Sequence, residues 1–403
     1  MSDSHAEPTD AAEGPGGGLS EAALVDAAAG DVVALAQELV RIDTTNPPAR
    51  ELPAAEHMAA WLAAAGLETR IQRFGADRAN LVARLRGTGE RPALMLSGHL
   101  DTVPVHDPAG WTVDPHGGLV RGDRLFGRGS LDMKGAVAAM SVAAKRLRAR
   151  GVMLKGDVVV ALTAGEETDS CGAELLCDAG WLDDVGMAVI GEPTDMDVGI
   201  GHRGALWVRV DVQGTSAHGS QPGVGLNAVQ ELLDWLEPKS SIEQLVAEPV
   251  DDTLGAGSVS LNIIGGGTSA NVIPDRAHAV LDFRTVPGQE HAAILSALHA
   301  RGGAGQVTVL RDGPPIKAPV GSSLVQASIA AVAEVTRAEP AVRGLPYMTD
   351  ASTFGPRLGI PTVVLGPGAE RFAHIEDESI DIAALETASA VYEAIAERLL
   401  VHD

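Results

Sequence analysis

Short aliphatic runs alternate with longer helical stretches over most of this chain, and this alternation constrains the fold more than any other feature. Four runs are rich in Val, Leu and Ala and are followed by turns, which is typical of strands buried in a sheet. They cover residues 81–85, 93–97, 157–163 and 187–190, and the helical stretches cover residues 21–41, 53–66, 133–150 and 173–179. Strands that alternate with helices predict a mainly parallel sheet covered by helices on both faces.

The pattern changes after residue 202. Three segments now alternate between polar and apolar residues, as half-exposed strands do, and they cover residues 205–212, 258–264 and 277–284. With helices near 228–236 and 290–300 and a strand at 306–310, the order becomes β-α-β-β-α-β, the ferredoxin-like pattern. Helices at 323–336 and 383–400 and a strand at 362–365 then resume the first pattern.

The simplest domain division is one domain interrupted by another. We predict an α/β domain formed by residues 20–202 and 316–403, with an inserted α+β domain of the ferredoxin-like type at residues 203–315. Residues 1–19 are small, acidic and rich in Gly and Pro, so we expect a disordered tail there.

Charge and hydropathy narrow the class of protein. The formal net charge is −24, which argues against a nucleic-acid partner, because phosphate binding needs clustered Lys and Arg. No apolar run reaches the roughly 18 residues of a membrane helix, and no basic stretch followed by an apolar core begins the chain. We therefore expect a cytoplasmic protein without a membrane partner. Cys171 and Cys177 are the only cysteines, and we interpret them as reduced packing residues.

Two motifs place acidic side chains near a histidine or before a helix. SGHLDTVP at residues 97–104 puts His99 and Asp101 on one face of extended backbone. A metal-bound imidazole whose other nitrogen donates to a carboxylate has this arrangement, although a strand-end His beside a turn-forming Asp would look the same. In GRGSLDMKG, at residues 127–135, Asp132 lies before a long apolar helix, where an ordinary N-cap is the alternative.

Three further motifs follow strands. Glu166 and Glu167 in AGEE are adjacent carboxylates that would repel one another unless a cation lay nearby. A solvated acidic loop at a helix start is the alternative. Glu192 in GEPT ends the next strand, and His374 follows a strand much later. Because ligands bind outside the carboxyl ends of strands in an open α/β sheet, we expect these side chains to meet at one edge.

In order and spacing, these motifs resemble the family of cocatalytic zinc hydrolases that includes acetylornithine deacetylase, succinyl-diaminopimelate desuccinylase, aminoacylase and glutamate carboxypeptidase. The resemblance runs from about residue 30 to the C-terminus and rests on SGHLDTVP, GRGSLDMKG, AGEE, GEPT, GTSAHGSQP, NVIPD with DFR, and GPG…AH. It implies a zinc-dependent amidohydrolase that deacylates a small N-acyl amino acid, and a lid or dimerisation role for the inserted domain.

The resemblance also implies a role for each residue of the site. Two zinc ions, with cobalt or manganese as alternatives, would be held by His99, Asp132, Glu167, Glu192 and His374. Asp132 would bridge them, and an unusual cis peptide bond would follow it. Glu166 would be the general base, and Asp101 would orient His99.

The inserted domain carries three further candidates. The resemblance implies that His218 stabilises the oxyanion, in the active site of the partner subunit of a homodimer, and that Asn271 and Arg284 bind the substrate. Arg suits a substrate carboxylate because its fork of donors matches the two oxygens. From the residues alone, His218 could equally be a loop histidine, and Arg284 could pair with Asp282 or Asp275.

The metal residues leave the substrate open. A dipeptidase or carboxypeptidase would use the same machinery, because both reactions hydrolyse an amide. A non-catalytic binding protein would instead show a broken ligand set or no base, whereas every expected position here holds a competent residue. We expect residues 347–351 to line the specificity pocket.

Overall fold

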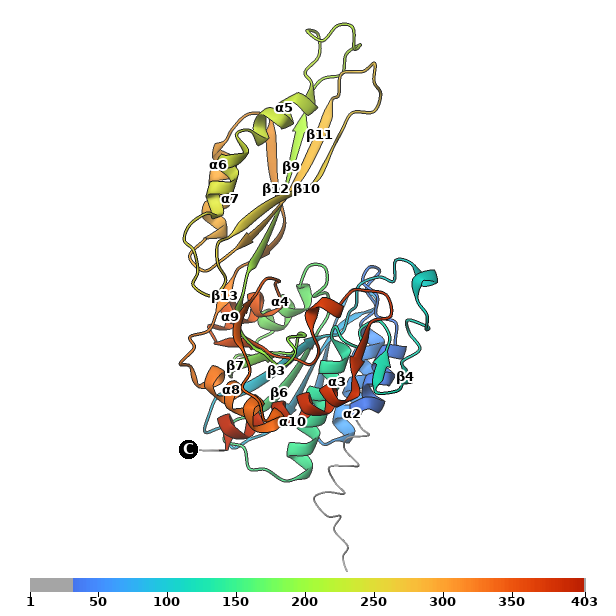
Figure 1. Ribbon diagram of the computed structural model, residues 1–403, viewed down its shortest axis with the longest axis vertical. Helices are drawn as coiled ribbons and strands as arrows, with labels where there is room; N and C mark the ends of the chain where they lie inside the picture. Colours follow the sequence, from blue (N-terminus) through green and yellow to red (C-terminus); the bar gives the residue numbers. More distant parts are fainter. Residues whose placement is uncertain (1–31, 402–403) are drawn as a thin grey trace, which may run out of the picture.

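The computed structural model describes residues 32–401, so the tail predicted at residues 1–19 lies outside the described part. It shows a larger body with a smaller one standing on it (Figure 1). The larger body is built on a nine-stranded sheet. Its strands, in spatial order, are β1 (Glu68–Phe74), β2 (Arg78–Leu85), β6 (Val158–Thr163), β3 (Ala93–His99), β7 (Val185–Ile190), β15 (Thr362–Val364), β8 (Val198–His202) and β13 (Ile316–Lys317), with β14 (Val342–Leu345) also paired to β8.

The sheet is parallel at its centre and mostly antiparallel toward its edges, where β14 alone pairs parallel with β8 among the described strands. Strands β6, β3, β7 and β15 run parallel to one another, whereas β1 with β2, β2 with β6 and β8 with β13 pair antiparallel. The expected mainly parallel sheet is therefore a mixed one. Every residue of β3 and β6 is buried, because helices cover both faces of the central strands.

Side chains of alternate strand residues point to opposite faces and form two cores. On one face, Leu94 and Leu96 pack with helices α2 (Leu52–Ala64), α3 (Lys134–Ala149), α8 (Ser323–Thr336) and α10 (Ile382–Leu400). On the other face, Met95 packs with α4 (Cys171–Asp178) and α9 (Ala351–Leu358). Residues 32–41 are also helical. Among the described helices, none has the length and hydropathy needed to cross a bilayer.

The smaller body is a four-stranded antiparallel sheet with helices on one face. Its strands lie in the order β10 (Ser258–Gly266), β11 (Arg276–Thr285), β9 (Gly204–Gln213) and β12 (Gly305–Gly313). Helices α5 (Ala228–Leu236), α6 (Lys239–Glu243) and α7 (His291–Ala300) cover it (Figure 1). All these elements fall within the segment 203–315. Their order is β-α-β-β-α-β with α6 as an addition.

A third, small sheet ties distant parts of the chain together. It consists of β16 (Ser379–Asp381), β5 (Arg124–Phe126) and β4 (Leu119–Arg121). The antiparallel pairing of β16 with β5 brings the segment after residue 374 alongside the segment that leads to residue 132. Two sequence regions that each carry a predicted metal ligand are thereby held side by side.

Candidate metal centre and active site

The predicted metal ligands meet at the carboxyl ends of the central strands. His99 is the last residue of β3, Glu167 follows β6, Glu192 follows β7, and Asp132 comes just before α3. His374 lies on the loop that follows the short 3₁₀ helix η3 (Glu370–Phe372). This edge of an open α/β sheet is where ligands bind, because the strands end there and only loops cover it.

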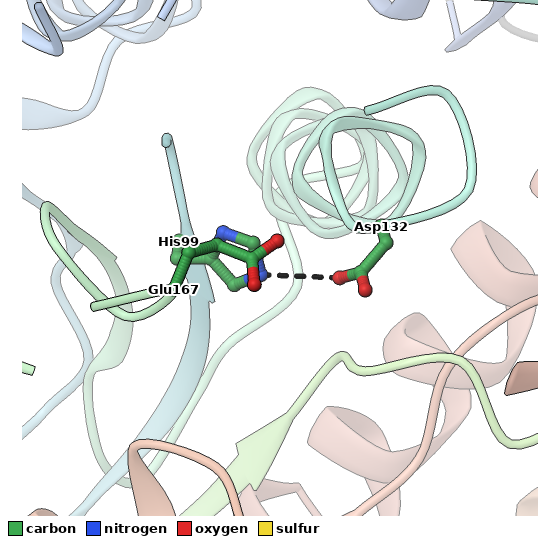
Figure 2. A group of neighbouring side chains, drawn as sticks. All are labelled: His99, Asp132 and Glu167. Carbon is green, nitrogen blue, oxygen red and sulfur yellow. Dashed lines mark hydrogen bonds and ion pairs between the residues drawn. The ribbon is translucent and has the colours of Figure 1, made fainter. Parts of the chain in front are cut away.

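Asp132 lies between two imidazoles. Its Oδ1 is 3.1 Å from Nε2 of His99 (Figure 2), and its Oδ2 is 3.1 Å from Nε2 of His374. Glu167 Oε1 lies 3.0 Å from Nε2 of His374, and Glu192 Oε1 lies 3.6 Å from Nε2 of His99. The two oxygens of one carboxylate therefore face two separate His–Glu pairs, as a bridging ligand would. The peptide bond between Asp132 and Met133 is cis.

The site holds more acidic groups than basic ones, and most are buried. Burial raises the pKa of Glu192 well above its ordinary value, and the nearby charge of Asp132 adds to this effect. Burial also raises the pKa of Glu167. Burial disfavours the charged form of His99, but Glu192, Asp132 and Asp101 outweigh it and raise the pKa of His99 well above its usual range. Such crowding of carboxylates is favourable only where cations balance it.

The donor set fits divalent metal ions. Ligand atoms of His99, Asp132 and Glu167 all lie within 4.8 Å of one another, and so do those of His99, Glu166 and Glu192. Mixed imidazole and carboxylate donors are typical of zinc and of related first-row metals.

Glu166 is buried beside this cluster. Burial raises its pKa to about 8, an effect that Asp350 and Glu167 reinforce and that His99 and Arg311 oppose. A carboxylate with a pKa near neutrality is suited to accept a proton and return it.

Asp101 acts on His99 through its backbone. The carbonyl oxygen of Asp101 lies 2.9 Å from His99 Nδ1, and because a carbonyl can only accept, Nδ1 carries a proton, so Nε2 is the nitrogen at which a metal would replace the other proton. The carboxylate is 3.6 Å from the ring. Its oxygens accept hydrogen bonds from the amides of Gly165, Glu166 and Glu167, at 2.9, 3.1 and 3.2 Å. The side chain therefore shapes the loop of the two glutamates, which the spacing of the motif did not predict.

Glu378 and Arg128 support Asp132 and were missed in the sequence. Glu378 is fully buried, and its Oε1 accepts from the amides of Leu131 and Asp132 at 3.0 and 3.1 Å. Its other oxygen pairs with the buried guanidinium of Arg128. In the sequence, Glu378 is one of three acidic residues in a short polar stretch, and no local pattern separates it from Glu376.

A cavity of about 260 Å³ opens onto the cluster. Tyr347 and Met348, from the expected specificity tract, line it together with Pro193 and Glu370. The hydroxyl of Tyr347 donates to the carbonyl of Pro193 at 2.9 Å and so fixes one wall.

The three candidates of the inserted domain do not line this cavity. His218 and Asn271 lie on adjacent loops, where the amide of Gly219 donates to the carbonyl of Asn271 at 2.7 Å. Figure 1 shows these loops, after β9 and between β10 and β11, at the end of the sheet remote from the larger body. Arg284 forms a fork with Asp282 at 2.9 and 3.0 Å, one of the pairings that the sequence left open.

Comparison with known proteins places these features in a family. The profile of peptidase family M20/M25/M40 matches residues 95–398. A probable succinyl-diaminopimelate desuccinylase from Staphylococcus epidermidis is 32% identical over 385 residues, which cover 87% of this chain and 93% of that protein. An acetylornithine deacetylase from Myxococcus xanthus is 32% identical over 371 residues, covering 88% and 93%.

Solved structures share the fold at low identity. An M20 family metallo-carboxypeptidase from Sulfolobus solfataricus superposes with a TM-score of 0.80 at 18% identity, covering 91% of this chain and 98% of that one. A dinuclear metal binding peptidase of the M20 family from Bacillus subtilis superposes with a TM-score of 0.67 at 17% identity, covering 93% and 98%.

Replacement of Glu378 by Ala should weaken metal binding. The change leaves Arg128 and two amides without their acceptor, and breaking a buried ion pair from one side costs about 3–5 kcal/mol. Loss of a group that supports a ligand lowers metal affinity about 10- to 100-fold. We expect a lower melting temperature and a lower zinc affinity, measured by calorimetry and by competition with a chelator. Glu378→Gln, which keeps an acceptor for the amides, should recover part of the affinity.

Asp157→Asn is the matched control. Asp157 is buried and pairs with Arg84 at 2.9 Å. It directly precedes β6 and so lies at the amino ends of the central strands, opposite to the site. The Asp157→Asn change should lower the melting temperature and leave zinc affinity unchanged. A Glu378→Ala protein with the zinc affinity of the wild type would contradict the supporting role.

Zinc binding to the metal-free protein should release protons. Hydrogen bonds to Asp132 and Glu167 raise the pKa of His374 to about 10, so this imidazole is protonated at pH 7. A metal ligand must be neutral, so the affinity should rise with pH up to that pKa, by about tenfold per pH unit for each proton released. Titration calorimetry in two buffers of different ionisation enthalpy measures this release, and equal heats in both buffers would contradict it.

Proposed function

Because the chain belongs to peptidase family M20/M25/M40, we propose that it is a two-metal amidohydrolase that removes the acyl group from N-acylated amino acids. The observation that carries the two-metal part is the Asp132 carboxylate, whose two oxygens face two different imidazoles. The two relatives at 32% identity, named as a desuccinylase and a deacetylase, support the deacylase part. The carboxypeptidase structure is 18% identical and supports the fold alone.

The ligands divide into two sets around Asp132. His99 and Glu192 lie on one side, and Glu167 and His374 on the other. We assign zinc to both positions, with cobalt or manganese as alternatives. Metal ions bound there would lower the pKa of a water molecule and polarise the scissile carbonyl.

Glu166 is assigned as the general base. It would take the proton of the attacking water and later give it to the leaving amine. Its buried position beside the ligand side chains supports this role. Asp101, through the amides of residues 165–167, holds the loop that carries it.

We assign residues 203–315 as a lid and dimerisation domain. His218 and Asn271 lie at its remote end, which suits a role in the site of a second copy of the chain better than a role in their own. Strand β10 is an edge strand, and it exposes Ile263 and Ile264 by 52% and 53%. An exposed apolar edge is a surface for pairing with another chain. When this lid closes over the site, Arg284 would break its pairing with Asp282 and bind the carboxylate of the substrate.

A substrate panel tests the proposed activity. The protein, supplied with zinc or cobalt, is assayed with N-acetylornithine, N-succinyl-diaminopimelate, other acyl amino acids and dipeptides. We expect a higher kcat/KM for acyl amino acids than for dipeptides. Hydrolysis of dipeptides alone would favour the dipeptidase alternative, and hydrolysis of neither would favour a binding protein.

Glu166→Gln and Glu167→Gln should separate base from ligand. The first change keeps size but removes the proton acceptor, so turnover should fall by about 10²- to 10⁴-fold while both metals stay bound. The second change removes a ligand and should lower metal content. If metal analysis gave the reverse result, the two assignments would be exchanged.

Mixing two inactive variants tests the role of His218. Heterodimers of a Glu166→Gln chain and a His218→Ala chain contain one intact composite site, provided that His218 serves the partner. We therefore expect part of the activity to return on mixing, measured as deacylation with the better substrate of the panel. No recovery despite demonstrated subunit exchange would mean that His218 acts within its own chain or not at all.

A further inference from the structure

One arginine of the smaller body reaches into the active-site loop of the larger one. Strand β12 pairs with β9 in a register that shifts between Val309 and Arg311, so Leu310 is an extra residue with no partner on β9. Such a bulge bends a strand and re-aims the side chains next to it. Here the shift occurs near the end of β12 that meets the larger body, where Figure 1 shows the strand descending toward α4 and α9.

The guanidinium of Arg311 makes its hydrogen bonds to the loop of residues 166–170. Its two terminal nitrogens donate to the carbonyl of Thr168 at 3.1 Å, to the carbonyl of Glu166 at 3.0 Å and to the hydroxyl of Ser170 at 3.2 Å. The charged group also lies over the ring of Trp207, 5.4 Å from its centre. Only 11% of the side chain is exposed. A planar fork with several donors can hold several acceptors at once, which a lysine ammonium does less well.

Asp101 and Arg311 therefore both hydrogen-bond to the backbone of this loop. Asp101 accepts hydrogen bonds from three of its amides, and Arg311 donates to two of its carbonyls and one hydroxyl. Asp101 belongs to the larger body, whereas Arg311 belongs to the smaller one. The position of Glu166 therefore depends on how the smaller body sits.

We propose that Arg311 is a positioning residue for Glu166, through which the inserted domain sets the geometry of the general base. The guanidinium contacts the backbone of the loop and lies 3.9 Å from the Glu166 carboxylate. It lines a separate hollow with Asp169 and Ser170, outside the cavity that opens onto the metal ligands. Its effect on catalysis is therefore exerted through Glu166, and this part rests on the proposed function.

Arg301 offers a closely matched control. It lies over the ring of Trp235, 5.1 Å from its centre, and donates to the carbonyls of Trp235 and Glu237 and to the hydroxyl of Ser241. Its chemistry is that of Arg311, but all its contacts remain inside the inserted domain. Arg301→Met should destabilise that domain without touching the loop.

The test compares Arg311→Met, Arg311→Lys and Arg301→Met in the full-length, metal-loaded protein. Hydrogen exchange of residues 164–171 reports how firmly the loop is held, and kcat and KM report how well Glu166 is positioned as the base. For Arg311→Met we expect faster exchange in this segment and a kcat lowered about 10- to 100-fold with little change in KM, as a small misplacement of a reacting group produces. Arg311→Lys should fall between Arg311→Met and the wild type. Arg301→Met should show neither effect.

Several results would overturn the proposal. These are unchanged exchange of residues 164–171 in Arg311→Met, a kcat within about two-fold of wild type, or the same losses in Arg301→Met. If Arg311→Met does not fold, Arg311→Lys is judged by the same criteria. If the wild-type protein hydrolyses no acyl amino acid, the proposed function fails, and the exchange measurement alone decides whether Arg311 holds the loop.

Discussion

The orientation of the Asp132 carboxylate is the constraint on which the rest of the site depends. Each of its oxygens lies 3.1 Å from a different imidazole, so a small rotation would lose one of the two. The fold fixes this orientation by joining distant segments. Strand β16 pairs with β5, and the buried Glu378 accepts hydrogen bonds from the amides of Asp132 and Leu131. The same C-terminal segment carries His374, so one segment supplies both a proposed ligand and the support for Asp132.

A second constraint is the concentration of negative charge at the end of the parallel strands. Four carboxylates surround two imidazoles where helices and loops exclude most of the water, and burial raises the pKa of Glu166, Glu167 and Glu192. Divalent cations would resolve this conflict, and the residues proposed to hold them lie beside Glu166, the proposed general base. The loop of Glu166 and Glu167 is in turn held by Asp101 from one body and by Arg311 from the other.

The sequence predicted which side chains would meet at the site, but not which residues hold them in place. Strand ends share an edge in an α/β sheet, so His99, Glu167 and Glu192 could be placed together from their strands alone. The supports Glu378 and Arg311 act on backbone groups more than a hundred residues away, and no local pattern records such contacts. The direction of the antiparallel edge strands and the remote position of His218 likewise depend on how whole elements are arranged.

Anomalous diffraction from crystals of the zinc-loaded protein tests the central claim most directly. Data collected on both sides of the zinc absorption edge locate each metal ion without reference to the rest of the structure. The account predicts two zinc peaks, one on each side of the Asp132 carboxylate, the first beside His99 and Glu192 and the second beside Glu167 and His374. A single peak, or two peaks of which only one contacts Asp132, would contradict it.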